Sequence, residues 1–427
     1  MPRASVPDPS ARPVPASSAV RPATGPANPG APASGPHWPD AEQAHPANAA
    51  ETAGILRGTR GTVVPVGAGT KTGWAAPPTS CDLVLHTGGL AGITEYLPGD
   101  LVVVAEAGVP LSALQQTLAE HGQMLALDPP EAGATLGGIV SANASGPRRL
   151  RYGTVRDLLI GVTVVLADGT VARAGGKVVK NVAGYDLGKL YTGAHGALGV
   201  VVSTTWRLHP LPPARATVTV PVPDSTQAGR CAVRLARSPL TPTAAELRWD
   251  GAGSGGALVV LFESTAASVR AQAREAVALL GGGTTGDDVP AWFGRRPRGG
   301  LVLRLAYAPA ALPQVLDALD ALGAPTQGAG GAPAGAHVTA SACTGVAYAA
   351  VPPGADLAVL RAALAPYDGS AVIVGGSPDG TAQAAGAGRT AAEHWGPPGD
   401  AFALMTRVKD RFDPGRRLSP GRLLGGL

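Results

Sequence analysis

Charged and aromatic side chains are scarce in this sequence of 427 residues, at 15% and 4% of the residues. No block of five or more Lys or Arg residues interleaved with aromatics occurs, and such a block is the usual electrostatic footprint of a nucleic-acid-binding protein. The formal net charge is only +4, which suits an anionic small molecule at least as well as a polymer. We therefore expect no nucleic-acid partner.

Cysteine is also rare, with Cys81, Cys231 and Cys343 far apart in the chain. They form no C-x-x-C pair of the kind that holds zinc or an iron–sulfur cluster, so we expect no metal site in this chain. An odd number of isolated cysteines is typical of reduced thiols in the cytoplasm.

Long apolar runs are missing as well. No stretch of about 18 uncharged apolar residues is present, so no transmembrane segment is expected. The first residues lead into Pro/Ala/Ser-rich sequence without the apolar run of a signal peptide. The sequence therefore predicts a cytoplasmic protein and leaves open a peripheral association with the inner membrane through partners.

The chain is long enough for more than one domain, and its composition changes along its length. Residues 1–49 are rich in Pro and Ala and predict a disordered tail. Residues 50–212 contain short β runs and a helix with Leu111, Leu114 and Leu118 on one face. They also contain a hairpin across the Asp168-Gly169 turn. The prolines at 210–213 mark a boundary. Residues 213–398 alternate strands with Ala/Leu helices, which predicts an α+β or α/β domain, and residues 399–427 form a C-terminal tail.

Three glycine-rich segments are the candidates for ligand binding. Residues 67–71, Gly-Ala-Gly-Thr-Lys, directly follow a strand, where backbone N–H groups can turn toward a phosphate, although an ordinary β-turn has the same appearance. A formal G-x-G-x-x-G at Gly251, Gly253 and Gly256 precedes a strand rather than a helix, so we interpret it as a hairpin loop.

The second segment, residues 134–146, is too rich in small residues to pack as a core strand or helix, and Arg148, Arg149 and Arg151 follow it. It suits a bulky anionic cofactor laid against backbone, and a surface loop with solvated arginines is the alternative. The third segment, residues 180–201, again combines glycines with the start of a strand, although a plain helix between two turns would also fit.

Together these segments resemble the FAD-binding domain of vanillyl-alcohol oxidase-like (PCMH-type) flavoproteins. The stretches GPRRLRYGTVRDLLIG, KNVAGYDLGKL and GQMLALDPP are similar to the second, smaller FAD-binding subunit of bacterial glycolate oxidase. The resemblance covers residues 54–212 well and is weak over 213–398. It returns at 411–422, where Ser419 replaces the asparagine usual in the family.

The resemblance implies an α+β fold, in which a two-subdomain, PCMH-type FAD-binding domain (50–212) is followed by a smaller C-terminal α/β cap (213–398), and residues 399–427 pack back on the FAD domain. It implies that FAD is bound noncovalently, because no His or Cys lies between Pro129 and Asp157 to tether it. The residues that it implies for cofactor binding are Gly67, Ala68, Gly69, Thr70, Lys71, Thr135, Gly137, Gly138, Ser141, Asn143, Gly146, Tyr152, Gly153, Gly199 and Val200.

The resemblance also implies a complex that oxidises glycolate, a 2-hydroxy acid, to glyoxylate, with a larger FAD-dependent catalytic subunit and an iron–sulfur subunit as partners. Relatives that oxidise hydroxy acids carry paired histidines in the C-terminal domain, whereas this domain has only His337 and His394, neither with a partner at metal spacing. The catalytic residues therefore stay unassigned. A self-sufficient hydroxy-acid or alcohol dehydrogenase and a non-catalytic assembly scaffold remain as alternatives.

Overall fold

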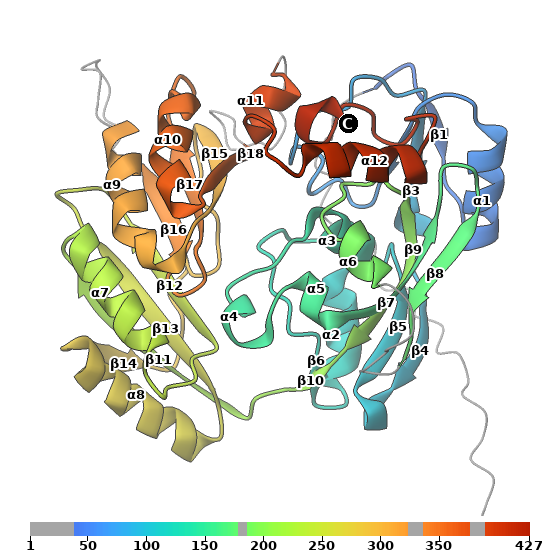
Figure 1. Ribbon diagram of the computed structural model, residues 1–427. Helices are drawn as coiled ribbons and strands as arrows, with labels where there is room; N and C mark the ends of the chain where they lie inside the picture. Colours follow the sequence, from blue (N-terminus) through green and yellow to red (C-terminus); the bar gives the residue numbers. More distant parts are fainter. Residues whose placement is uncertain (1–37, 178–185, 323–335, 376–388) are drawn as a thin grey trace, which may run out of the picture.

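The structure is a computed structural model that describes residues 38–177, 186–322, 336–375 and 389–427, arranged as two domains joined by two chain crossings (Figure 1). The predicted segment at 180–185 lies outside the described residues. Helix and strand are mixed, as the sequence predicts.

The first domain begins with a small parallel sheet in the order β1 (Glu42–Ala44), β3 (Leu83–His86), β2 (Val63–Val66), with helix α1 (Ala49–Gly58) beside it. Asn48 caps the start of α1 by accepting a hydrogen bond from the Glu51 N–H. Strand β1 falls inside the segment that the sequence assigns to a disordered tail. Its three residues carry little apolar surface, and their backbone pairing with 83–85 holds them in the fold.

A second, antiparallel sheet completes this domain in the order β4 (Ile93–Leu97), β5 (Val102–Glu106), β9 (Val200–Arg207), β7 (Leu159–Val165), β8 (Val171–Gly175). The hairpin that the Asp168-Gly169 turn predicts is confirmed as β7 and β8. A short pair, β6 (Gln123–Met124) and β10 (His209–Pro210), lies nearby. The helices are α2 (Leu111–Ala119), α3 (Leu136–Ala142), α4 (Arg149–Tyr152), α5 (Val155–Leu158) and α6 (Leu187–Tyr191).

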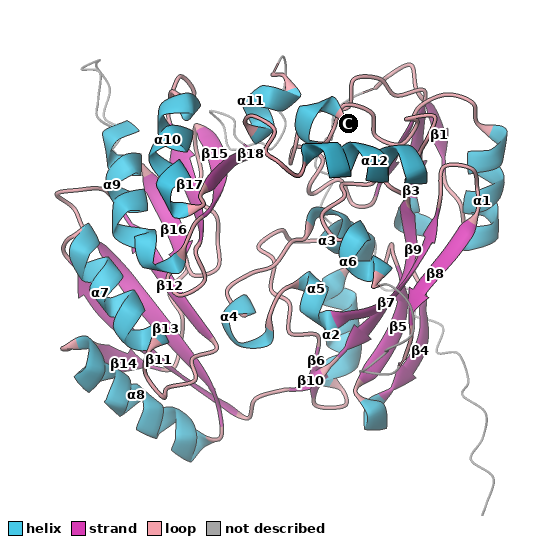
Figure 2. Ribbon diagram, viewed as in Figure 1, coloured by secondary structure: helices cyan, strands magenta, loops and turns pink. Residues whose placement is uncertain are grey.

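The second domain is one eight-stranded antiparallel sheet with helices on one side only (Figure 2). The strand order is β14 (Thr284–Gly286), β11 (Ala214–Val222), β13 (Gly256–Ser264), β12 (Ala244–Trp249), β16 (His337–Ser341), β17 (Val346–Val351), β15 (Leu301–Ala306), β18 (Ser370–Gly375). The covering helices are α7 (Ser225–Ala236), α8 (Ala266–Leu280), α9 (Leu312–Leu322) and α10 (Leu357–Leu364). Gly251 and Gly253 lie in the β12–β13 connection with positive φ, which confirms the hairpin loop.

Strand alternation gives this sheet two different faces. Residues such as Leu247, Leu303 and Ala340 point to the helices and form the domain core. Their neighbours point the other way, toward the first domain, and several of these are polar, of which five lie on the four strands β12, β15, β16 and β17 close to the first domain. We call them the polar sheet face: Glu246, Arg304, Thr339, Ser341 and Tyr348.

The C-terminal tail, with α11 (Ala391–Trp395) and α12 (Phe402–Phe412), returns to the first domain. The buried Lys409 ammonium donates to the Asp413 carboxylate (2.7 Å) and to the carbonyls of Ala197 (2.8 Å) and Leu418 (2.9 Å). Asp413 in turn accepts from the Leu418 N–H (2.7 Å) and the Arg417 N–H. Every hydrogen of this ammonium is thus used to hold residues 413–418 against the first domain. No helix among the described residues is long and apolar enough to cross a membrane.

Replacing Lys409 with methionine should lower the free energy of unfolding by about 3–5 kcal/mol, because it leaves the buried Asp413 carboxylate without its counter-charge. Urea denaturation followed by circular dichroism measures the change. Asp410→Asn is the matched control, since Asp410 pairs with Arg416 on the exposed side of the same helix and should change stability by less than about 1 kcal/mol. Equal losses of stability in the two variants would contradict the role assigned to the buried Lys409–Asp413 pair.

Candidate functional site

The loop of residues 67–71 leaves β2 with its amide groups free. The N–H groups of Gly67, Ala68, Gly69, Thr70 and Lys71 donate to no acceptor within the described part of the chain, and these residues line one cavity. Gly69 has a φ of 71°, in the left-handed region that glycine adopts without strain. Consecutive amides of this kind form a concave site for an anion such as a phosphate.

Arg422, from the C-terminal tail, holds this loop from its carbonyl side. One guanidinium nitrogen, Nη2, donates to the carbonyls of Trp74 (2.8 Å), Thr72 (2.9 Å) and Lys71 (3.2 Å). Burial lowers the pKa of Arg422 to about 10, so the side chain stays charged at neutral pH. The arginine also lines the cavity, and it therefore adds a fixed positive charge to the row of amides.

Helix α3 forms the second wall. Thr135 caps it, and the Thr135 Oγ1 accepts from the Gly138 N–H at 3.4 Å. A Cβ atom on Gly137 would lie 2.8 Å from the Ala107 Cβ, so glycine allows the helix to approach strand β5 closely. Gly138 and Ser141 face the cavity from this helix.

The third wall consists of residues 195–201, which lead into β9. His195 has a left-handed backbone (φ 49°), and its N–H donates to the Ser141 carbonyl at 2.8 Å. Burial, and then the charges of Arg422 and Arg304, lower the pKa of His195 to about 3. The imidazole is therefore neutral at physiological pH.

We call the space between these three walls the cradle. It brings together most of the residues that the sequence analysis assigns to the cofactor: Gly67, Ala68, Gly69, Thr70, Lys71, Thr135, Gly137, Gly138, Ser141, Gly199 and Val200.

Four predicted residues do not line the cradle. Asn143 ends α3 in a left-handed conformation (φ 48°), with its side-chain oxygen buried and without a partner among the described residues. Gly146 lines a different cavity. The Tyr152 ring, at the end of α4, lies at a tilt against that of His209, and Gly153 lies close to the Asp157 side chain.

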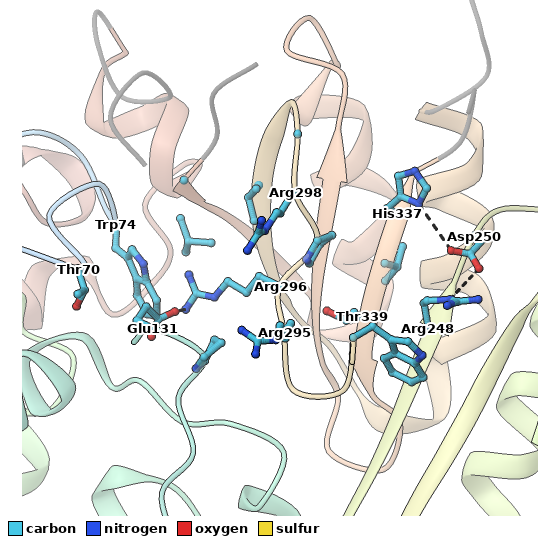
Figure 3. A pocket seen from close by; sticks show the side chains of 18 residues that line it. Thr70, Trp74, Glu131, Arg248, Asp250, Arg295, Arg296, Arg298, His337 and Thr339 are labelled. Atoms are coloured by element: carbon cyan, nitrogen blue, oxygen red, sulfur yellow. Dashed lines mark hydrogen bonds and ion pairs between the residues drawn. The ribbon is translucent and has the colours of Figure 1, made fainter. Parts of the chain in front are cut away.

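A larger cavity of about 500 Å³ lies beside the cradle, between the two domains (Figure 3). Residues 292–299, which we call the arginine strap, cross it from the second domain. The Arg296 guanidinium lies 3.9 Å from the centre of the Trp74 ring and 4.6 Å from that of Tyr348, and it pairs with Glu131 at 2.6 Å. Glu131 also pairs with Lys71 of the loop at 3.5 Å. The strap is thus connected to the cradle through charged side chains.

A small cavity inside the strap reaches the polar sheet face. Glu246, Ser341 and Tyr348 line it from the sheet, while Ser145, Gly146 and Arg149 line it from the first domain. Burial raises the pKa of Tyr348, but Arg296, Arg304 and Arg149 outweigh this effect and hold that pKa below the ordinary tyrosine value. The interface therefore carries an excess of positive charge around one phenol.

The sequence analysis assigned neither three of the cradle residues nor the polar sheet face to the site. His195, Ser419 and Arg422 lie in segments that it quotes without assigning them to the cofactor. The polar sheet face has a detectable signal, because single polar residues interrupt apolar strands with period two, as in 244–249 and 337–341. Which side of the sheet faces the first domain is not encoded in that period.

The cradle fits the diphosphate of a dinucleotide cofactor. Free amides, one buried arginine and a glycine-lined wall supply donors and close approach, and no carboxylate side chain lines it among the described residues. The neighbouring 500 Å³ cavity provides room for a flat ring system between the domains.

Comparisons with known proteins agree with this geometry. Residues 43–175 match the protein family described as FAD binding domain. The glycolate oxidase subunit GlcE of Escherichia coli is 43% identical over 123 residues, which cover 28% of this chain and 35% of that protein. A D-lactate dehydrogenase of Archaeoglobus fulgidus is 33% identical over 237 residues, 51% of this chain and 53% of that protein.

Among solved structures, an alkyldihydroxyacetonephosphate synthase has the same fold, with a TM-score of 0.63 at 14% identity over 88% of this chain and 75% of that one. The matches to the two curated relatives span about half of their length or less. The chain therefore contains a PCMH-type FAD-binding domain, and the family resemblance seen in the sequence is confirmed.

Replacing Arg422 with methionine should weaken FAD binding about tenfold to a hundredfold, because hydrogen bonds from a charged group contribute about 1.5–3 kcal/mol. Titration of the apoprotein with FAD, followed by flavin fluorescence, measures the affinity. Arg416→Met removes an exposed arginine of the same tail and should leave the affinity unchanged. Equal affinity in both variants would exclude Arg422 from the site.

Replacing Gly138 with leucine should abolish FAD retention, because the new side chain would start 3.2 Å from Thr135 Oγ1 and fill the cradle. The flavin-to-protein absorbance ratio of the purified variant gives the occupancy. Gly54→Leu is the control, since Gly54 lies on α1 with open space around it. Full flavin content in Gly138→Leu would remove this residue from the cofactor site.

Proposed function

We propose that this chain is the FAD-binding subunit of a glycolate oxidase-like complex, which oxidises glycolate or a related 2-hydroxy acid to the 2-oxo acid. The observation that carries the proposal is the row of free amides at 67–71, backed by Arg422, with Thr70 of this loop lining the same cavity as Thr339 of the polar sheet face. FAD would supply the electron-accepting ring, since a flavin takes a hydride and releases electrons singly.

The cofactor residues follow from the cradle. Gly67, Ala68, Gly69, Thr70 and Lys71, with Arg422, would hold the diphosphate, while Thr135, Gly137, Gly138 and Ser141 would lie along the rest of the molecule. The residues Gly199 and Val200 would close the third wall. Asn143 and Gly146 belong to the strip that leads toward the interface, where Gly146 lines the cavity that Glu246 shares.

We propose that FAD is bound noncovalently. Among the described residues that line the cradle, His195 is the single side chain of a type that tethers flavins. Its side chain is half-buried, and its backbone N–H and left-handed backbone conformation hold the residue in the wall.

The partners in this proposal are a larger FAD-dependent subunit and an iron–sulfur subunit. The chain has three isolated cysteines and so cannot bind a four-cysteine cluster of its own. Electrons that reach its flavin therefore need an external carrier. The complex would lie in the cytoplasm or at the inner face of the membrane. A self-sufficient dehydrogenase is the second candidate, because the polar sheet face provides charged groups next to the cradle.

Purified protein should be yellow and should release its flavin into the supernatant on acid precipitation. The complex isolated with its partners should reduce an electron-accepting dye with glycolate at least about tenfold faster than this chain alone, since the chain lacks a cluster. Colour that stays in the pellet would overturn noncovalent binding. Equal rates would favour the self-sufficient dehydrogenase, and a complex that is inert toward every 2-hydroxy acid would refute the proposed activity.

A further inference from the structure

Building on the proposed function, we propose that Glu246 is the acid–base residue of this interface, and that its carboxylate takes the hydroxyl proton of the 2-hydroxy acid. The sequence suggests no base for this chain, because His337 and His394 lack partners. In the structure, His337 is partly exposed beside Asp250, and His394 is buried on α11, where its carbonyl accepts from Arg361. Glu246 lies instead where the two domains meet.

The position of Glu246 follows from the sheet. It lies on β12, between β13 and β16, and its neighbours Ala245 and Leu247 point into the domain core. The carboxyl group therefore points to the first domain. It lines the small cavity with Gly146, which the sequence assigns to the strip along the cofactor. This cavity, of about 20 Å³, shares Pro130, Arg295, Arg296 and Thr339 with the 500 Å³ cavity, so the two cavities adjoin at these residues.

The carboxyl group is buried, and one of its two oxygens has no partner among the described residues. Glu246 is 7% exposed, and this oxygen is Oε1. A buried polar atom without a partner costs stability, so its retention needs another reason. Glu263 gives the contrast. It lies on the same face of the next strand and is also 7% exposed, but both its oxygens accept from Arg148 of the first domain (2.8 and 3.2 Å).

The charged and titratable groups around Glu246 come from both domains. Burial raises its pKa to about 8, while Arg149 and Ser341 act in the opposite direction and Asp128 adds to the rise. Tyr307 and Cys343 also lie near enough for the Glu246 charge to raise their own pKa values. Tyr348 and Arg296 line the same cavity. The Glu246 carboxyl group is therefore ionised in about a tenth of the molecules at pH 7 and in most of them above pH 9.

The chemistry balances with this single base. A flavin held by residues 67–71 and Arg422 would supply the two-electron acceptor and would take the hydride when the C–H bond of the hydroxy acid breaks. The hydroxyl group on the same carbon loses its proton to the Glu246 carboxylate. The electron pair of the broken O–H bond then forms the C=O bond of the oxidised product. Arg149, Arg296 and Arg304 surround this end of the interface with positive charge, which suits the substrate carboxylate. A carboxyl with a pKa near the working pH is well matched to such a transfer.

The first measurement uses the apoprotein and needs no turnover. Because folding raises the pKa of Glu246, the folded protein binds more protons than the unfolded one between about pH 4.5 and 8. The stabilising contribution is therefore present below pH 4.5 and is lost as the pH rises toward 8. Thermal melts of the full chain between pH 5 and 9 should show this loss, and Glu246→Gln should flatten it. If the melting temperatures of wild type and Glu246→Gln depended on pH in the same way, the proposal would be overturned.

The second measurement is anaerobic reduction of the FAD-loaded full chain by glycolate or D-lactate, followed by loss of the flavin's visible absorbance. The wild-type rate should rise about tenfold per pH unit below pH 8 and then level off. Glu246→Gln should reduce the rate at least about a hundredfold at equal flavin content and remove that dependence. Glu263→Gln, the matched control, should keep the wild-type pH profile. A wild-type flavin that no 2-hydroxy acid reduces, or equal reduction of wild type and Glu246→Gln, would refute the role of Glu246. The proposed function would be refuted separately, by a complete complex that is inert toward every 2-hydroxy acid.

Discussion

The contact between Arg422 and the loop at 67–71 is the constraint on which the site depends. In a peptide unit the N–H and the C=O point in opposite directions. The carbonyls of Lys71, Thr72 and Trp74 accept hydrogen bonds from the Arg422 guanidinium, which holds them on the side of the loop away from the cradle. The amides that precede them are then left for a ligand. The candidate anion site therefore depends on an arginine more than 350 positions away in the sequence, which lies on the C-terminal tail.

That tail is in turn fixed by a buried ion pair. Lys409 and Asp413 satisfy each other and the carbonyls around them, and Leu418 pairs with Val63 at the base of strand β2, from which the loop departs. Two further charged contacts orient the second domain over the cradle, namely Arg148 with Glu263 and Arg296 with Glu131. Buried pairs of this kind contribute geometry more than stability, because desolvation offsets much of their attraction.

The second domain separates its two tasks by strand alternation. Core residues such as Leu247 and Ala340 pack under the helices, which gives the sheet its stability. The opposite face is left for Glu246, Tyr348 and Arg304, which meet the first domain instead of water. An antiparallel sheet covered on one side is suited to this arrangement, because its free face can carry polar groups without weakening the core.

The sequence by itself determined the FAD-binding domain and most of the cradle wall. Gly67, Gly69, Gly137 and Gly138 are local signals, because backbone that closely approaches a ligand needs residues without side chains. Strand β1 was missed because backbone pairing with a distant strand holds it, and its side chains carry no pattern. The role of Arg422 and the convergence of Glu246 with Gly146 were decided by tertiary structure alone. Both depend on contacts between segments about 100 to 350 residues apart, and neither periodicity nor spacing records which distant faces will meet.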